Sequence, residues 1–190
     1  MSKSIKAVIA IIVIAVIIGF PVITTYNKLV SLDQKVKSAQ SNIETLLERR
    51  SALIPNLVET VRGYAAQEKD ILTELANART KLAGSVTLTD KANADSQLSS
   101  ALSRLLVVVE KYPDLKSSQS FRDLTVSLEG TENRIAIARQ DYNKTVDNYN
   151  TAIKRFPSSV VASLFRFDEK TYFRASVISK EVPKVEFKKE

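Results

Sequence analysis

Residues 46–59 have the sequence Leu-Leu-Glu-Arg-Arg-Ser-Ala-Leu-Ile-Pro-Asn-Leu-Val-Glu, which places a proline and two adjacent arginines inside an otherwise regular apolar pattern. From Leu29 onward, apolar residues recur at alternating spacings of three and four, which is typical of a helix packed against other helices. Arg50 occupies a position in this stripe where an apolar residue would be expected. The stretch therefore predicts a long amphipathic helix with a charged residue facing its core.

Pro55 predicts a kink in this helix. Proline has no N–H to donate to the carbonyl of Ser51, and its ring crowds that carbonyl. We expect Asn56 or a neighbouring arginine to hydrogen-bond the freed carbonyl. Beyond Pro55 the apolar stripe shifts by about four residues while the first register continues beside it, so the apolar face widens. A wider face needs more than one neighbour, which favours a bundle over a two-stranded coiled coil.

The rest of the pattern predicts an all-α fold, an elongated antiparallel up-and-down bundle of three to four helices preceded by one N-terminal transmembrane helix. Gly84 is suited to end the first helix and Asp90 to cap the second, and the second should stop before Pro113. The predicted helices span residues 26–83, 91–111 and 119–155, with a loop at 114–118 and a short last helix that Ser158 caps.

Residues 7–23 carry no charge and follow Lys3 and Lys6. Their length is at the lower end of what crosses a bilayer, and no small-x-small cleavage site follows, so they predict an uncleaved single-pass anchor. The lysines on the two sides of this segment are too evenly balanced to set its orientation. The predicted organisation is an anchor at 1–25, a bundle at 26–165 and a flexible tail of mixed charge at 166–190.

Composition excludes several classes of function. The chain of 190 residues has no cysteine and no histidine, so it lacks disulfides, thiolate or imidazole metal sites and Ser-His or Cys-His catalytic arrangements. The net charge of +7 is spread along the chain with both signs interspersed, and no basic platform with aromatic residues is present, which argues against nucleic-acid binding. We expect no cofactor, no metal and no catalytic residue.

Polar residues at core-type positions allow two interpretations. The favoured one is a structural network that fixes the helix register, made of Arg50, Glu110, Glu132, Arg139 and Asn143. The alternative pairs Glu110 with Glu132 as the acid and base of a hydrolase. Five aromatic residues are expected to lie in the core or to plug helix ends: Tyr112, Phe121, Tyr142, Tyr149 and Phe156.

A series of spaced motifs resembles the LemA family. The motifs are Arg49-Arg50, residues 53–58, residues 61–64, Ala78-Arg79, residues 110–116, Phe121, residues 131–136, Ala138-Arg139, Tyr142-Asn143, Tyr149-Asn150 and Phe156-Pro157. The resemblance covers Tyr26 to about Phe165. Gln67 departs from the family pattern, which often has histidine at the position before Glu68. The resemblance implies a membrane-anchored bacterial helical bundle without an established activity, with its N-terminus outside and the bundle in the cytoplasm.

These observations predict a non-enzymatic interaction or scaffold protein, anchored in the bacterial cytoplasmic membrane through residues 7–23. Its partner is expected to be an unidentified protein or a second copy of the chain. Two alternatives stay open: a membrane-associated hydrolase that uses carboxylates, and a surface protein whose tail binds anionic lipid.

Overall fold

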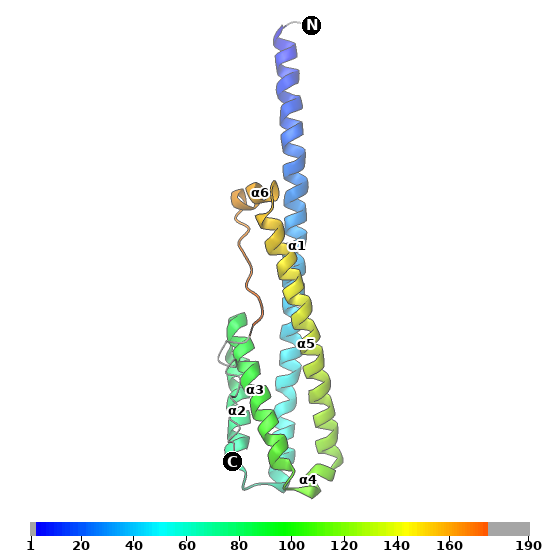
Figure 1. Ribbon diagram of the computed structural model, residues 1–190, viewed down its shortest axis with the longest axis vertical. Helices are drawn as coiled ribbons and strands as arrows, with labels where there is room; N and C mark the ends of the chain where they lie inside the picture. Colours follow the sequence, from blue (N-terminus) through cyan, green and yellow to red (C-terminus); the bar gives the residue numbers. More distant parts are fainter. Residues whose placement is uncertain (1–2, 175–190) are drawn as a thin grey trace, which may run out of the picture. The chain divides into compact units, whose positions relative to one another are not determined.

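The computed structural model describes residues 3–174, with side chains described at 13, 16, 17 and 19–174. All regular secondary structure in this part is α-helical (Figure 1). The chain forms two compact units: the first comprises residues 1–44 and 136–172, the second residues 45–135 and the chain from Phe173. The helices are α1 (Lys3–Tyr64), α2 (Lys69–Gly84), α3 (Leu88–Val109), α4 (Pro113–Ser117), α5 (Gln119–Lys154) and α6 (Ser158–Leu164).

The expected helix over residues 26–83 is wrong in one respect, because it is divided between α1 and α2. The last turn of α1 closes with a hydrogen bond from the Ala65 N–H to the Val61 carbonyl. A tighter turn follows, in which the Glu68 N–H donates to the carbonyl of Ala65, three residues before it. Tyr112, from the connection between α3 and α4, holds the corner. Its hydroxyl donates to Glu68 Oε1 at 2.8 Å and accepts from Gln67 Nε2 at 2.9 Å.

Helices α2 and α3 form a hairpin within the second unit, and Figure 1 shows them side by side. Gly84 ends α2, as predicted. The cap of α3 is Thr87 and not Asp90: Thr87 Oγ1 accepts a hydrogen bond from the Asp90 N–H at 3.1 Å. Asp90 lies three residues after the cap, where its carboxylate interacts favourably with the positive end of the helix dipole.

The stretch predicted as a loop at residues 114–118 contains a helical turn, α4. Pro113 begins it, because a proline in the first turn loses no helical hydrogen bond. Leu115 lies on this turn and is fully buried. The predicted helices at 119–155 and from Ser158 correspond to α5 and α6, although Pro157 holds the cap position of α6 and the Phe156–Pro157 peptide bond is cis.

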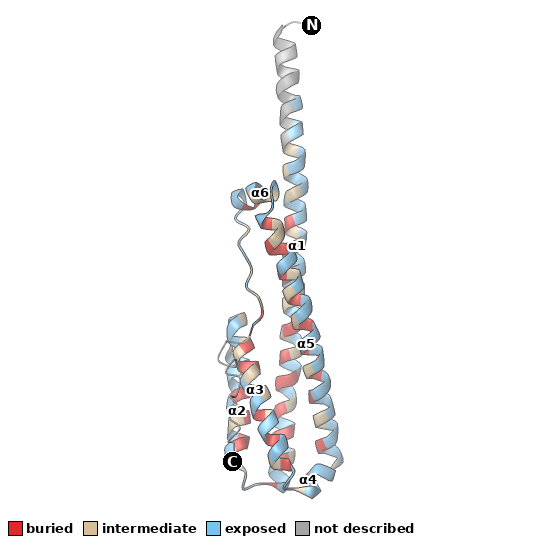
Figure 2. Cartoon of the chain, viewed as in Figure 1, coloured by how far each residue is buried: buried red, intermediate tan, exposed pale blue. Residues whose placement is uncertain are grey.

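Each unit has an apolar core along its helices, visible as the buried positions in Figure 2. On α5 the buried face follows the predicted register as far as Tyr142 and then moves by one position to Val146, Asn150 and Ile153, although Tyr149 also stays buried. A straight helix drifts from a strict seven-residue repeat, which explains this movement. The expectation for Phe156 is therefore wrong: its side chain is 84% exposed.

None of the helices described here, over the residues with described side chains, is long and apolar enough to cross a bilayer. Most of the predicted anchor at residues 7–23 lies outside the described side chains. The anchor stays a prediction.

Pro55 does not end α1, which continues through it to Tyr64. The carbonyl of Ser51, which proline leaves without its helical partner, accepts a hydrogen bond from Arg79 Nε of α2 at 3.3 Å. An arginine does therefore satisfy the freed carbonyl, but it comes from the next helix. The proline and Arg79 together tie α2 to α1 at this level, and a kink at Pro55 stays a prediction.

We predict that Arg79→Ala lowers the free energy of unfolding by about 1 kcal/mol, because a partly buried carbonyl loses its donor. In a Pro55→Ala background residue 55 supplies an N–H to Ser51, so the loss should fall by about 1 kcal/mol. Urea denaturation of the four proteins of this cycle measures the coupling. The control is Arg104→Ala, which removes an exposed pair with Glu74 and should cost about 0.5 kcal/mol or less in both backgrounds. Equal losses for Arg79→Ala in the two backgrounds would refute the link.

Candidate functional site

A buried ion cluster joins three helices of the second unit. Arg50 comes from α1, Asp95 from α3 and Glu132 from α5. Arg50 Nη1 lies 2.6 Å from Asp95 Oδ1 and 2.5 Å from Glu132 Oε2. The Asp95 and Arg50 side chains are almost completely buried, whereas that of Glu132 is 40% exposed. The guanidinium therefore compensates one fully buried carboxylate and one at the edge of solvent.

The two contacts of Arg50 differ in kind. The bond to Asp95 has the geometry of a hydrogen bond. The contact with Glu132 is an ion pair only, because Glu132 Oε2 has no hydrogen-bond partner, and the Nε of Arg50 is also buried without one. Removing one member of such a cluster leaves an uncompensated buried charge, which costs far more than the intact cluster contributes.

The structure brings together only part of the predicted network. Arg50 and Glu132 meet, but Glu110 lies elsewhere, with its carboxylate 2.6 Å from Lys116 Nζ. Arg139 and Asn143 belong to the other compact unit.

Asp95 was not predicted, although a signal for it exists. It lies three residues before Leu98 and seven before Leu102, in the apolar register of α3. A carboxylate at a core position of one helix requires a cation from another, and Arg50 is the cation at a core position.

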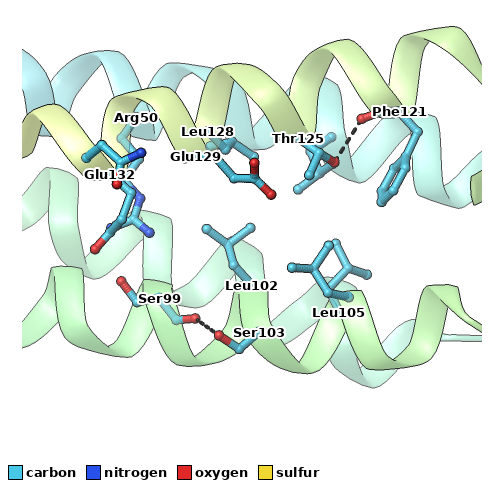
Figure 3. A pocket seen from close by; sticks show the side chains of 13 residues that line it. Arg50, Ser99, Leu102, Ser103, Leu105, Phe121, Thr125, Leu128, Glu129 and Glu132 are labelled. Atoms are coloured by element: carbon cyan, nitrogen blue, oxygen red, sulfur yellow. Dashed lines mark hydrogen bonds and ion pairs between the residues drawn. The ribbon is translucent and has the colours of Figure 1, made fainter.

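A cavity of about 490 Å³ lies beside this cluster, between α1, α3 and α5 (Figure 3). One part of its wall is apolar: Leu57, Leu102, Leu105, Leu106, Phe121 and Leu128. The remaining lining residues are polar: Arg50, Ser99, Ser103, Thr125, Glu129, Glu132 and Asn133. We call this cavity the α1/α3/α5 groove.

The polar end of the groove carries an excess of negative charge. Glu129 and Glu132 both line it, and Asp95 lies behind them on Arg50. Arg50 is the one basic residue among the lining residues, which include the two carboxylates of Glu129 and Glu132. Glu129 is exposed, so its carboxylate is available to a cation in the groove.

In the first unit, the chain after α6 turns at Phe165 and Arg166 and then runs without regular secondary structure to Tyr172. We call residues 165–172 the strap (Figure 1). The prediction of a flexible tail from residue 166 is wrong for this part. Side chains of α5 hold the backbone of the strap: Tyr142 Oη donates to the Thr171 carbonyl at 2.8 Å, and Tyr149 Oη to the Asp168 carbonyl at 3.1 Å. The two predicted core tyrosines thus combine burial with a defined hydrogen bond.

Asn150 makes the most complete contact with the strap. Its Nδ2 donates to the Lys170 carbonyl and its Oδ1 accepts from the Lys170 N–H, both at 2.9 Å. The amide thereby pairs with both backbone groups of one residue, as a neighbouring strand would. Asn150 is only 4% exposed, and these bonds satisfy its polar atoms.

Lys170 adds an electrostatic bond between the strap and α1. Its Nζ lies 2.8 Å from Asp33 Oδ1 and 5.4 Å from the centre of the Tyr149 ring. Burial alone would raise the pKa of Asp33, but the hydrogen bonds and charges of Lys170 and Lys37 outweigh it and lower that pKa below its usual value. Asp33 therefore stabilises the folded unit above its ordinary pKa and loses this contribution as the pH falls through the lowered value.

Burial raises the pKa of Tyr149 to about 12, with further contributions from the charges of Asp33 and Asp168. Burial likewise raises the pKa of Tyr142. Both hydroxyls thus stay protonated and able to donate to the strap at neutral pH.

The matching family model is that of the LemA family, and it covers residues 39–187. The chain belongs to the LemA family. Several residues of the motifs that resemble this family make the contacts described above. Arg50 belongs to the ion cluster, Arg79 donates to the Ser51 carbonyl, and Tyr112 holds the α1–α2 corner. Three residues of α5 bind the strap: Tyr142, Tyr149 and Asn150.

Three similar proteins have been compared with this LemA-family chain. Magnetosome protein MamQ 2 of Paramagnetospirillum magneticum is 30% identical over 176 residues, covering 78% of this chain and 64% of the relative. Magnetosome protein MamQ of Magnetospirillum gryphiswaldense is 27% identical, with the same shares covered. Protein LemA of Metamycoplasma hominis is 26% identical, covering 81% of this chain and 71% of the relative. The chain thus spans slightly less than two thirds of the length of the MamQ relatives.

We predict that Arg50→Met lowers the free energy of unfolding by about 3–5 kcal/mol, because the buried carboxylate of Asp95 loses its short bond to the guanidinium. Arg50→Met combined with Asp95→Leu should recover most of this loss, since no buried charge remains. Urea denaturation measures both. Arg49→Met, which removes the exposed neighbouring arginine, is the matched control and should change little. If the double variant were as unstable as the single one, the ion cluster would not be the cause.

The raised pKa of Tyr149 predicts a loss of stability in alkali. A group whose pKa is raised on folding stabilises the protein below its ordinary value of 10, and this contribution disappears as the pH rises toward about 12. Tyr149→Phe should be less stable at neutral pH but should show a shallower further loss between these two pH values. Urea denaturation along this pH series, with Tyr64→Phe as a control that removes an exposed hydroxyl, measures the difference. Parallel curves for Tyr149→Phe and the original protein would contradict it.

Proposed function

We propose that the protein is a non-enzymatic interaction module of the bacterial envelope, anchored as a single-pass protein in the cytoplasmic membrane through residues 7–23. Its docking site is the α1/α3/α5 groove, and its partner is a polypeptide segment that combines apolar side chains with a basic one. The observation that carries the proposal is the groove itself, which joins an apolar wall to an end lined by two carboxylates, Glu129 and Glu132, and one guanidinium, Arg50.

The shape and chemistry of the groove set the requirements on the partner. Leucine and phenylalanine side chains line the apolar part, so aliphatic or aromatic side chains of the partner gain by leaving water there. Glu129 and Glu132 line the polar part and favour a lysine or arginine.

The contacts of the carboxylates support binding over hydrolysis. Glu132 is paired with Arg50, and Glu110 is paired with Lys116 and does not line the groove. The pair of free carboxyl groups that the hydrolase alternative requires is therefore not assembled around this cavity. Within the described residues, no three acidic side chains gather into a site for a metal ion.

A displayed peptide library selected against the full chain in detergent tests the proposed groove. We expect enriched peptides to carry a basic residue among apolar ones and to lose binding to Glu129→Lys. The matched control is Asp123→Lys, which makes the same charge change on an exposed position of α5 outside the groove and should retain binding. Selected peptides that bind both variants equally, or enrichment of acidic peptides, would overturn the proposal.

A further inference from the structure

Helix α6 carries apolar side chains on two faces. Val161 and Ala162 are buried in the first unit, whereas Val160 and Leu164, which are four residues apart, are 60% and 71% exposed. Phe156 before the helix and Phe165 after it are 84% and 48% exposed. Single exposed apolar residues are common, but four within ten consecutive residues form a patch that needs a partner.

Two aromatic contacts fix the position of this patch along α1. The ring of Tyr26 lies 4.8 Å from that of Phe165 and 5.7 Å from that of Phe167, measured between centroids. Tyr26 follows the end of the apolar stretch at residue 23 by three residues, which is a rise of about 5 Å along the helix. The patch on α6 therefore lies beside the end of the predicted anchor.

The end of α6 is a defined turn. Arg166 adopts a left-handed conformation with φ of 58°, and the Phe167 N–H donates to the Ala162 carbonyl at 2.9 Å. This is the hydrogen bond of a Schellman motif, in which the left-handed residue reverses the chain at a helix end. It returns Phe167 to the ring of Tyr26 and leaves the outer face of α6 toward solvent.

Basic side chains surround the patch. Arg155, Arg166 and Lys28 are exposed, and Lys154 pairs with Glu169 at 2.7 Å. Asp168 is the other acidic side chain of the segment from 154 to 169. The neighbourhood thus presents apolar and aromatic residues together with a small positive excess.

We propose that α6 lies on the bilayer surface, with Phe156, Val160, Leu164 and Phe165 among the lipid headgroups and Arg155, Arg166 and Lys28 toward anionic phosphates. The inference rests on the proposed membrane anchor. Aromatic residues with basic neighbours concentrate at the interface between water and hydrocarbon, and that is the level at which Tyr26 places α6. The membrane contact then has two parts, a spanning helix and a surface helix held beside it.

The chain has no cysteine, so single cysteines carry an environment-sensitive fluorophore to chosen positions. Full-length protein is reconstituted into vesicles of phosphatidylcholine and phosphatidylglycerol that contain spin-labelled lipid. Phe20→Cys, in the predicted anchor, reports on insertion of the anchor. Val160→Cys reports on α6. Gln34→Cys, an exposed position eight residues beyond Tyr26, is the aqueous control.

We expect lipid carrying the spin label deep in its acyl chain to quench the probe at residue 20, and lipid labelled near the headgroup to quench the probe at 160. The probe at 34 should be quenched by neither. Quenching at 20 with a probe at 160 that behaves like the one at 34 would overturn the inference and leave the anchor standing. No quenching at 20 would overturn the anchor itself. A probe at 160 that is shielded from water but not quenched by lipid would mean that a protein covers α6, which also overturns the inference.

A second variant separates lipid contact from folding. Phe156→Ser combined with Leu164→Ser changes two exposed side chains, so the helical circular dichroism should be unchanged while quenching at 160 is lost. Arg155→Glu combined with Arg166→Glu should reduce quenching at 160 in vesicles with phosphatidylglycerol more than in vesicles of phosphatidylcholine alone. Unchanged quenching in the serine variant would contradict the proposal.

Discussion

The guanidinium of Arg50 is the constraint on which the second unit depends. It lies between a carboxylate from α3 and one from α5, and these contacts link three helices at one level. Apolar side chains tolerate a shift of one helix along another, because leucine packs almost equally well one turn away. A buried aspartate does not, because such a shift breaks its short contact with the guanidinium of Arg50. The ion cluster thus selects one register among several that the apolar pattern alone would allow.

In the first unit, uncharged polar groups fix the relative position of two segments. Here the element to be placed is the strap, whose backbone donors and acceptors are not paired within a helix of its own. Asn150 satisfies both backbone groups of Lys170, and Tyr142 and Tyr149 satisfy two further carbonyls. Because these three side chains lie on α5 at fixed spacings, they fix which residues of the strap lie beside which turn of the helix.

The sequence predicted what depends on local periodicity. The helix at residues 119–154 and the end of α2 at Gly84 follow from spacing and from a helix-terminating glycine. The division between α1 and α2 was missed because its main support, Tyr112, lies 44 residues beyond Glu68, and no local pattern announces it. Asp95 was missed because the buried face at the start of α3 is made by small residues, Ala92 and Ala94, which leave the position of a core charge unmarked.

The strap and the exposed face of α6 were beyond prediction for a related reason. A segment that adds no apolar stripe has the composition of a loose tail, and only its partners on α5 show that it is held. Phe156 continues the spacing of the α5 stripe, but the drift of a straight helix brings Ile153 into the core and leaves Phe156 outside. The spacing of apolar residues therefore predicts the buried face of a helix less reliably at the end of the helix than in its middle.

The two ends of α6 explain why its apolar residues remain exposed. Rotation of the helix about its axis would bury Val160 and Leu164 but would expose Val161 and Ala162. The left-handed turn at Arg166 and the bonds of Asn150 to Lys170 fix the chain after the helix, and the buried Ile153 fixes the chain before it. A short helix held at both ends cannot hide a second apolar face within its own unit. Its exposure is thus a consequence of how the strap is bound, and any surface that covers α6 must come from outside the unit.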